Sequence, residues 1–217
     1  MNRQGNNLRM QLTDKPGEIH TLFLDHSINI SAELTNALRA LGPVTFPDRP
    51  DRGLGYQLAR SVVGQQISAK AARAIWKRIE TSATKEGQKI PAFFENKREN
   101  LLRTCGISRN KVKALIAIQN AYNDGYLDAK KLLKLDHKSR SEELNKIWGV
   151  GQWTCDMASI FYFRSPDIWP ESDSAVQKTF TKFIGTRDPS STASNFSPYR
   201  SYLALAMWRI LDGMPQA

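Results

Sequence analysis

Residues 144–180 read LNKIWGVGQWTCDMASIFYFRSPDIWPESDSAVQKTF and decide the fold of this chain. Apolar residues on both sides of Gly149-Val150-Gly151 predict two short helices joined by a tight turn. The glycines permit positive φ and the close approach of another backbone. The second helix is predicted to begin at Gln152, where free N–H groups and the positive end of the helix dipole suit an anion such as a phosphate. An ordinary helical corner is the alternative interpretation.

The residues after the turn set the order of the remaining elements in this segment. The apolar helix is expected to end near Phe163, and Ser165 and Pro166 then form a turn. Asp173 precedes another helix, where its side chain is suited to be the N-cap. From the local sequence, Asp173 fits a structural N-cap and a catalytic carboxylate equally well.

The composition points to a polyanionic partner. The chain has 217 residues, a formal net charge of +10 and a pI near 9.7. Lysine and arginine neutralise phosphates and release their counterions, so nucleic acid is the leading partner and a merely soluble basic protein is the alternative. Arg109, Lys111 and Lys113 form one basic cluster, which either contacts phosphate or is a solvated face.

The cysteines and histidines do not indicate a metal or cofactor site. Cys105 and Cys155 lack paired spacing, so we expect free thiols. Two cysteines cannot supply the four thiolates of an iron–sulfur cluster. The scattered His20, His26 and His137 are expected to be surface or capping residues. With no apolar run long enough for a bilayer and no signal sequence, we expect an intracellular protein, in the cytoplasm or nucleoid if bacterial and the nucleus if eukaryotic.

The rest of the chain is predicted to be mostly helical, since alternating apolar patterns are almost absent. Residues 31–42 predict a helix with Ser31 as N-cap and Gly42 as its end. Residues 56–79 predict two helices broken at 64–68, with Ser68 suited to cap the second. Residues 101–125 predict two more helices separated at Gly106.

Several spaced motifs occur together in one order. The hairpin Gly149-Val150-Gly151-Gln152-Trp153-Thr154 is followed by Asp173, by Val176 and Phe180, and by Tyr199-Arg200-Ser201-Tyr202 leading into Trp208. In this order the chain resembles the helix-hairpin-helix DNA glycosylase superfamily, and within it the 3-methyladenine DNA glycosylase II family. The resemblance covers roughly residues 56–211.

The resemblance implies a two-lobed, mostly α-helical fold with the active site in the cleft between the lobes. Residues 1–217 would then form one glycosylase domain that acts as a monomer. Lobe one would span about 52–164 and contain the hairpin, and lobe two about 16–51 plus 165–217. Residues 1–15, which are polar and show little periodicity, are expected to be a loose arm.

The reaction implied by the resemblance belongs to base excision repair. The enzyme would bind double-stranded DNA, flip out alkylated purines of the 3-methyladenine and 7-methylguanine type, and hydrolyse the N-glycosidic bond. Asp173 would be the catalytic carboxylate, ranked above Glu171 and Asp156 because only it matches the motif position. Trp153 occupies the place where bifunctional relatives carry a lysine, which implies a monofunctional enzyme that leaves an abasic site.

A substrate-base pocket is implied at Trp153, Trp208 and Met157. Indole faces attract the positive charge of N3- and N7-alkylated purines. Met157 and Arg209 depart from the tyrosines of well-studied relatives, which leaves the shape of the pocket open. For Trp208, packing in the hydrophobic core is the alternative to a role in the pocket.

The resemblance also implies a DNA-binding surface. It includes Gln65 and the wedge residue Gln66, which fills the gap left by a flipped nucleotide, although a polar helix-breaking loop is the alternative there. The hairpin residues Gly149, Val150, Gly151, Gln152 and Thr154, together with Arg200, would complete the surface. The backbone carbonyls of Asn145, Ile147 and Val150 match positions that hold a monovalent cation, sodium or potassium, in relatives.

Two other functions stay open. A non-catalytic helix-hairpin-helix DNA-binding protein would use the same hairpin, but it needs neither Asp173 nor a tryptophan-lined pocket. Excision of oxidised or mismatched bases is the second, and the missing hairpin lysine disfavours its lyase-type members.

Overall fold

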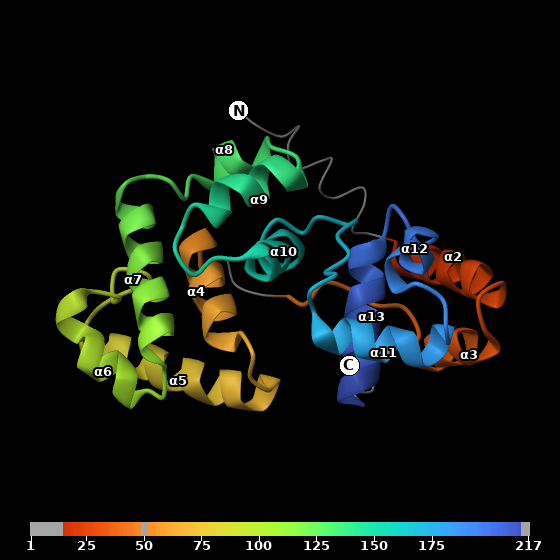
Figure 1. The fold of residues 1–217 in the computed structure, drawn as a ribbon, viewed down its shortest axis with the longest axis horizontal. Coiled ribbons are helices and arrows are strands. Elements are labelled where there is room, and N and C mark those ends of the chain that lie inside the picture. Colours follow the sequence, from red (N-terminus) through yellow and green to blue (C-terminus); the bar gives the residue numbers. More distant parts are fainter. Residues whose placement is uncertain (1–14, 49–51, 214–217) are drawn as a thin grey trace. The chain divides into compact units, whose positions relative to one another are not determined.

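The computed structural model describes residues 15–48 and 52–213, and every regular element within those ranges is a helix (Figure 1). The prediction of a mostly helical chain is confirmed. None of these helices is long and apolar enough to cross a membrane. The chain divides into two compact units, one formed by residues 49–163 and the other by residues 1–48 together with 164–217. We call them the continuous unit and the discontinuous unit.

The continuous unit is built around its first helix, α4 (Leu54–Gly64), which packs against α5, α7 and α10. Leu58, Val62 and Val63 on α4 are almost fully buried, as its apolar periodicity predicts. Figure 1 shows α4 between α7 and α10. The other helices of this unit are α5 (Ala69–Lys85), the 3-10 helix η1 (Asn96–Arg98), α6 (Glu99–Thr104), α7 (Arg109–Asn123), α8 (Ala129–Leu133), α9 (His137–Asn145) and α10 (Gln152–Phe161).

In the described part of the discontinuous unit, two N-terminal helices join three C-terminal ones. Its helices are α2 (Pro16–Ile28), α3 (Ala32–Leu41), α11 (Ser174–Ile184), α12 (Pro189–Ser194) and α13 (Arg200–Asp212). The rings of Phe23 and Phe180 pack edge-on against Phe196, at centroid distances of 5.2 Å and 6.4 Å. Such aromatic contacts join segments that are distant in sequence into one core.

Local capping signals predicted several helix boundaries correctly. The Ser31 side chain accepts the Leu34 N–H at the start of α3, and Gly42, with φ +73°, follows its end. Ser68 caps α5 in the same way by accepting the Ala71 N–H. Helix α2 was not predicted, and its proline at the first helical position was the available signal. The predicted loose arm lies, except for Lys15, outside the described residues.

Candidate functional site

The predicted hairpin is present in the continuous unit. Helix α9 ends at Asn145, α10 begins at Gln152, and the Val150 N–H donates to the Ile147 carbonyl at 3.0 Å to close the turn. Gly149 has φ +83°, and a Cβ there would lie 2.4 Å from the Cβ of Ala114 on α7. Any side chain would therefore collide with α7.

The two hairpin glycines do not share one role. Gly151 has φ −102° and ψ 179°, which is open to other residues, and a Cβ there would meet nothing within 4 Å. The expectation of positive φ thus holds for Gly149 and is wrong for Gly151. Gly149, Gly151 and Gln152 are exposed, and no side chain caps the start of α10. The start of α10 therefore has the position and exposure expected of an anion site.

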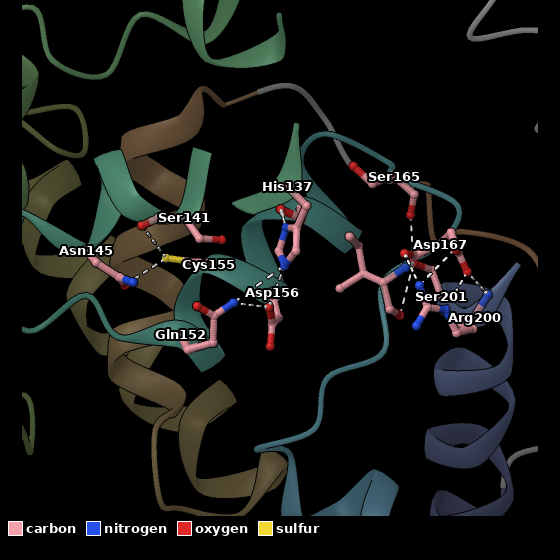
Figure 2. A network of polar contacts seen from close by, with 12 residues as sticks. His137, Ser141, Asn145, Gln152, Cys155, Asp156, Ser165, Asp167, Arg200 and Ser201 are labelled. Atoms are coloured by element: carbon pink, nitrogen blue, oxygen red, sulfur yellow. Dashed lines mark hydrogen bonds and ion pairs between the residues drawn. The ribbon is translucent and has the colours of Figure 1, made fainter. Parts of the chain in front are cut away.

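A polar network joins the two helices of the hairpin (Figure 2). The Asp156 carboxylate, in a residue only 3% exposed, accepts a bond from Gln152 Nε2 at 2.8 Å and contacts His137 Nε2 at 3.0 Å. The other His137 nitrogen contacts Ser159 Oγ at 3.1 Å. This order of carboxylate, imidazole and hydroxyl is found in hydrolases, but Ser159 is fully buried and cannot reach a substrate.

The network therefore braces the hairpin, and Asp156 is a structural carboxylate. His137 is partly exposed, which agrees with the expectation of a surface residue, but its ring also links α9 to α10. No local signal marks this pairing, since His137 and Asp156 stand 19 residues apart.

The loop between α4 and α5, residues 65–68, carries the predicted wedge, and we call it the wedge loop. Gln66 is exposed and has φ +56°, which is uncommon for a residue with a side chain. The neighbouring Gln65 side chain instead points back to the hairpin, where its Nε2 donates to the Gly149 carbonyl at 3.2 Å and to Thr154 Oγ1 at 2.9 Å. Thr154 is 0% exposed, which contradicts the prediction that it contacts DNA directly.

The carbonyls predicted to hold a monovalent cation belong to the hairpin turn. The Ile147 carbonyl accepts the Val150 N–H and, having two lone pairs, can still serve a cation. These neutral oxygens suit a hard, singly charged ion. Within residues 15–48 and 52–213, no cluster of three or more His, Cys, Asp or Glu side chains is arranged to hold a metal ion.

Both cysteines are buried free thiols, as predicted. The Cys155 thiol donates to Asn145 Oδ1 at 3.2 Å within the hairpin (Figure 2). Burial, with the nearby Asp156 charge, raises the pKa of Cys155 to about 12. The thiol is therefore protonated and inert at neutral pH.

In the discontinuous unit, Asp173 is buried at the start of α11. Its Oδ1 accepts the Val176 N–H at 2.9 Å, so the N-cap interpretation is correct. The same oxygen accepts the indole N–H of Trp208 at 3.2 Å. The structure thus brings together the predicted catalytic carboxylate and one predicted pocket tryptophan, and the helix cap fixes the carboxylate's orientation.

The predicted pocket residues differ in exposure. Trp208 keeps part of its surface exposed, whereas residues 201–207 before it on α13 are buried. On α10 of the continuous unit, Trp153 is also partly exposed and lies beside Gly64, and Met157 is only 5% exposed. Arg209 donates to the Thr45 carbonyl at 3.3 Å within the discontinuous unit.

Arg200 is held by an ion pair. Its Nε and Nη2 donate to the two carboxylate oxygens of Asp167, at 2.7 Å and 2.9 Å, in a bidentate arrangement (Figure 2). Burial alone would raise the pKa of Asp167, but hydrogen bonds from Arg200 and Ser197 outweigh that effect and lower it. Of the two partners expected for Arg200, a phosphate or a carboxylate, the structure shows the carboxylate, and the contact with DNA stays a prediction. No local signal in the sequence marks Asp167, because its partner lies 33 residues away.

The sequence was compared with families and individual proteins of known name. No model of a protein family matches the chain. It is 25% identical over 193 residues to the alkylbase DNA glycosidase-like protein mag2 of Schizosaccharomyces pombe, covering 85% of this chain and 91% of that protein. It is 29% identical over 138 residues to DNA-3-methyladenine glycosylase 1 of the same yeast, covering 61% of this chain and 60% of that protein's length.

Solved structures show the same fold. A 3-methyladenine DNA glycosylase of Schizosaccharomyces pombe, Mag1, superposes with a TM-score of 0.75 at 22% identity, covering 88% of this chain and 95% of that one. A 3-methyladenine DNA glycosylase of Archaeoglobus fulgidus gives a TM-score of 0.68 at 16% identity, covering 98% of this chain and 76% of that one. The chain is therefore similar in sequence to proteins named as 3-methyladenine DNA glycosylases, and it shares the helical fold of solved members of that group.

Proposed function

We propose that this protein is a base excision repair glycosylase that removes alkylated purines from double-stranded DNA and leaves an abasic site. The observation that carries the proposal is the Asp173 carboxylate, capped on α11 and hydrogen-bonded to Trp208. A purely DNA-binding protein needs no buried carboxylate beside a partly exposed tryptophan. Two facts about relatives support the proposal: several are named as DNA-3-methyladenine glycosylases, and the Mag1 structure is a complex with abasic DNA.

Asp173 would act on the deoxyribose of the flipped nucleotide. As the C–N bond lengthens, positive charge develops on the sugar, and a carboxylate held in advance stabilises that charge. The same group orients or deprotonates the attacking water, which adds to the sugar as the base departs with its bonding electrons. The bonds from Val176 and Trp208 hold the carboxylate, so little reorganisation is required when the charge appears.

The choice of substrate would follow from the charge of the lesion. N3- and N7-alkylated purines are cationic, and an indole face such as that of Trp153 or Trp208 attracts a cation by ~0.5–2 kcal/mol. They are also good leaving groups, so a strong general acid is not required. Trp153 stands where a lysine would form a Schiff base, and indole has no such amine, which supports a monofunctional reaction.

The hairpin would bind the DNA backbone. The exposed residues Gly149, Gly151 and Gln152 stand at the start of α10, whose first N–H groups suit a phosphate. The carbonyls of Asn145, Ile147 and Val150 would hold a sodium or potassium ion, which supplies a positive charge toward that phosphate. We propose that the chain acts as a monomer.

The test is the release of free bases from methylated duplex DNA by the wild type and by Asp173→Asn. Asparagine is also a good N-cap, so the variant should keep the stability of the wild type within about 0.5 kcal/mol. Its excision rate should fall about 10²–10³-fold with DNA affinity unchanged. Asp188→Asn is the matched control, because Asp188 caps α12 in the same unit by accepting the Ser191 N–H at 2.7 Å.

Other outcomes would count against the proposal in distinct ways. DNA binding by the wild type without release of any methylated base would indicate the non-catalytic alternative. Equal rates for the wild type and Asp173→Asn would remove Asp173 from the chemistry. A covalent DNA adduct trapped by borohydride would exclude a monofunctional mechanism.

A further inference from the structure

The wedge loop and the hairpin are connected through one side chain. Both bonds described above for Gln65 come from its Nε2, at 3.2 Å to the Gly149 carbonyl and 2.9 Å to Thr154 Oγ1. An amide nitrogen carries two protons, so these two bonds use its full capacity as a donor. One acceptor belongs to the turn and the other to the first turn of α10, the segment proposed to hold a phosphate.

The backbone of Gln65 is fixed as well. Lys111 on α7 donates through Nζ to the Val63 carbonyl at 2.8 Å and to the Gln65 carbonyl at 2.7 Å. These carbonyls lie at the end of α4, where the negative end of the helix dipole favours a cation. The same helix α7 supplies Ala114, against which Gly149 packs. One helix therefore supports the wedge loop and the hairpin turn together.

Gln66 stands between two fixed points. Gln65 is held before it by the hairpin and Lys111, and Ser68 after it is the N-cap of α5. Its φ of +56° is unfavourable for a residue with a Cβ, by roughly 1–2 kcal/mol, and persists only where the surroundings impose it. The fixed backbone therefore sets the direction of the Gln66 Cα–Cβ bond relative to the hairpin.

We propose that Gln65 is a positioning residue that couples the wedge residue Gln66 to the phosphate-binding hairpin. The proposal rests on the function proposed above. Once the hairpin is seated on a phosphate, Gln65 holds the wedge loop at a fixed offset from it, so Gln66 enters the duplex at the position of the extruded nucleotide. Without the Gln65 bonds, the protein still binds DNA, but a smaller fraction of complexes has the wedge inserted.

The test uses Gln65→Met, which keeps the length of the side chain and removes its donors. Gln119→Met is the matched control, because Gln119 on α7 also donates from Nε2 to a backbone carbonyl, that of Ala92 at 3.1 Å. Three quantities are measured: affinity for undamaged duplex, fluorescence of 2-aminopurine opposite an abasic-site analogue, and the single-turnover rate of base release. Fluorescence reports insertion of the wedge without any chemistry.

For Gln65→Met we expect the inserted population and the excision rate to fall about 10-fold, the effect of losing two neutral hydrogen bonds. Affinity for undamaged duplex should change less than about 3-fold, and Gln119→Met should match the wild type in all three measurements. In the Gln65→Met background, Gln66→Ala should lower the excision rate little further, because both substitutions act by reducing insertion of the wedge. Thr154→Val, which loses one of the two bonds, should give a smaller change in the same direction.

Equal behaviour of Gln65→Met and Gln119→Met, or full additivity with Gln66→Ala, would overturn the proposal. So would a fall in affinity for undamaged duplex as large as the fall in excision, since that indicates a direct DNA contact. If Gln65→Met fails to fold, Thr154→Val decides the outcome. If the wild type releases no base, the proposed function fails, and the fluorescence measurement still decides the role of Gln65.

Discussion

Replacing Gly149 with alanine should disrupt the hairpin more than any other single-methyl change in the turn. Alanine at φ +83° is unfavourable by about 1–2 kcal/mol. Its Cβ would also lie 2.4 Å from the Ala114 Cβ, a contact that requires α7 or the turn to shift. Overpacking of this kind typically destabilises by about 1–3 kcal/mol. The two effects together predict a loss of about 2–5 kcal/mol, against a total stability of about 5–15 kcal/mol.

The assay is urea unfolding followed by circular dichroism, with DNA affinity measured on the same preparations. Gly151→Ala is the matched control two residues away, because its φ is ordinary and its Cβ would meet open space. It should keep the free energy of unfolding within about 0.5 kcal/mol. Gly149→Ala should lose both stability and DNA affinity, since the turn and the start of α10 move together.

A second substitution separates the collision from the backbone strain. Ala114→Gly removes the colliding methyl group and by itself destabilises helix α7 by about 1 kcal/mol. In the Gly149→Ala background it should remove the overpacking of about 1–3 kcal/mol, so the double variant keeps only the cost of positive φ and the cost of about 1 kcal/mol for glycine in α7. A loss below about 1 kcal/mol for Gly149→Ala, or additivity of the two substitutions, would refute the packing explanation.

Two further predictions concern ionisable groups. Because the pKa of Asp167 is lowered by Arg200 and Ser197, its contribution to stability is complete above the ordinary carboxyl pKa and is lost as the pH falls through the lowered value. Asp167→Asn should therefore flatten the fall of the urea midpoint between about pH 5 and about pH 2, and a curve parallel to the wild type would contradict this. Cys155, with a pKa raised to about 12, should not react with a thiol reagent at pH near 8 in the folded protein, and should react fully in denaturant. Rapid labelling in native buffer would show that the hairpin opens.

The network around Asp156 shows where prediction from sequence fails. The polar residues His137, Gln152 and Asp156 look like ordinary surface positions in the sequence, yet they form one contact between two helices in which the Asp156 carboxylate is buried. Burial of a carboxylate is decided by the elements that pack over it. The position of a charged residue in an amphipathic segment does not show which elements will cover it. The contact between Asp156 and His137 was therefore not predicted.

The chain by itself determined the local features of this protein. Helix boundaries followed from caps at Ser31, Ser68 and Asp173, whose bonds reach only three residues along the chain. The hairpin followed from its glycines and the apolar residues around them, and the order of spaced motifs pointed to the family. These signals are readable because the interacting groups are neighbours in sequence.

The tertiary structure alone decided which distant groups meet. It paired Gln65 with Thr154 across 89 residues, Trp208 with Asp173 across 35 and Arg200 with Asp167 across 33. It also showed why Gly149 is required, through Ala114 on another helix. Such pairs depend on how helices pack, and packing is set by the whole core at once. A pattern in the sequence therefore identifies candidate residues, and only the fold shows which of them are in contact.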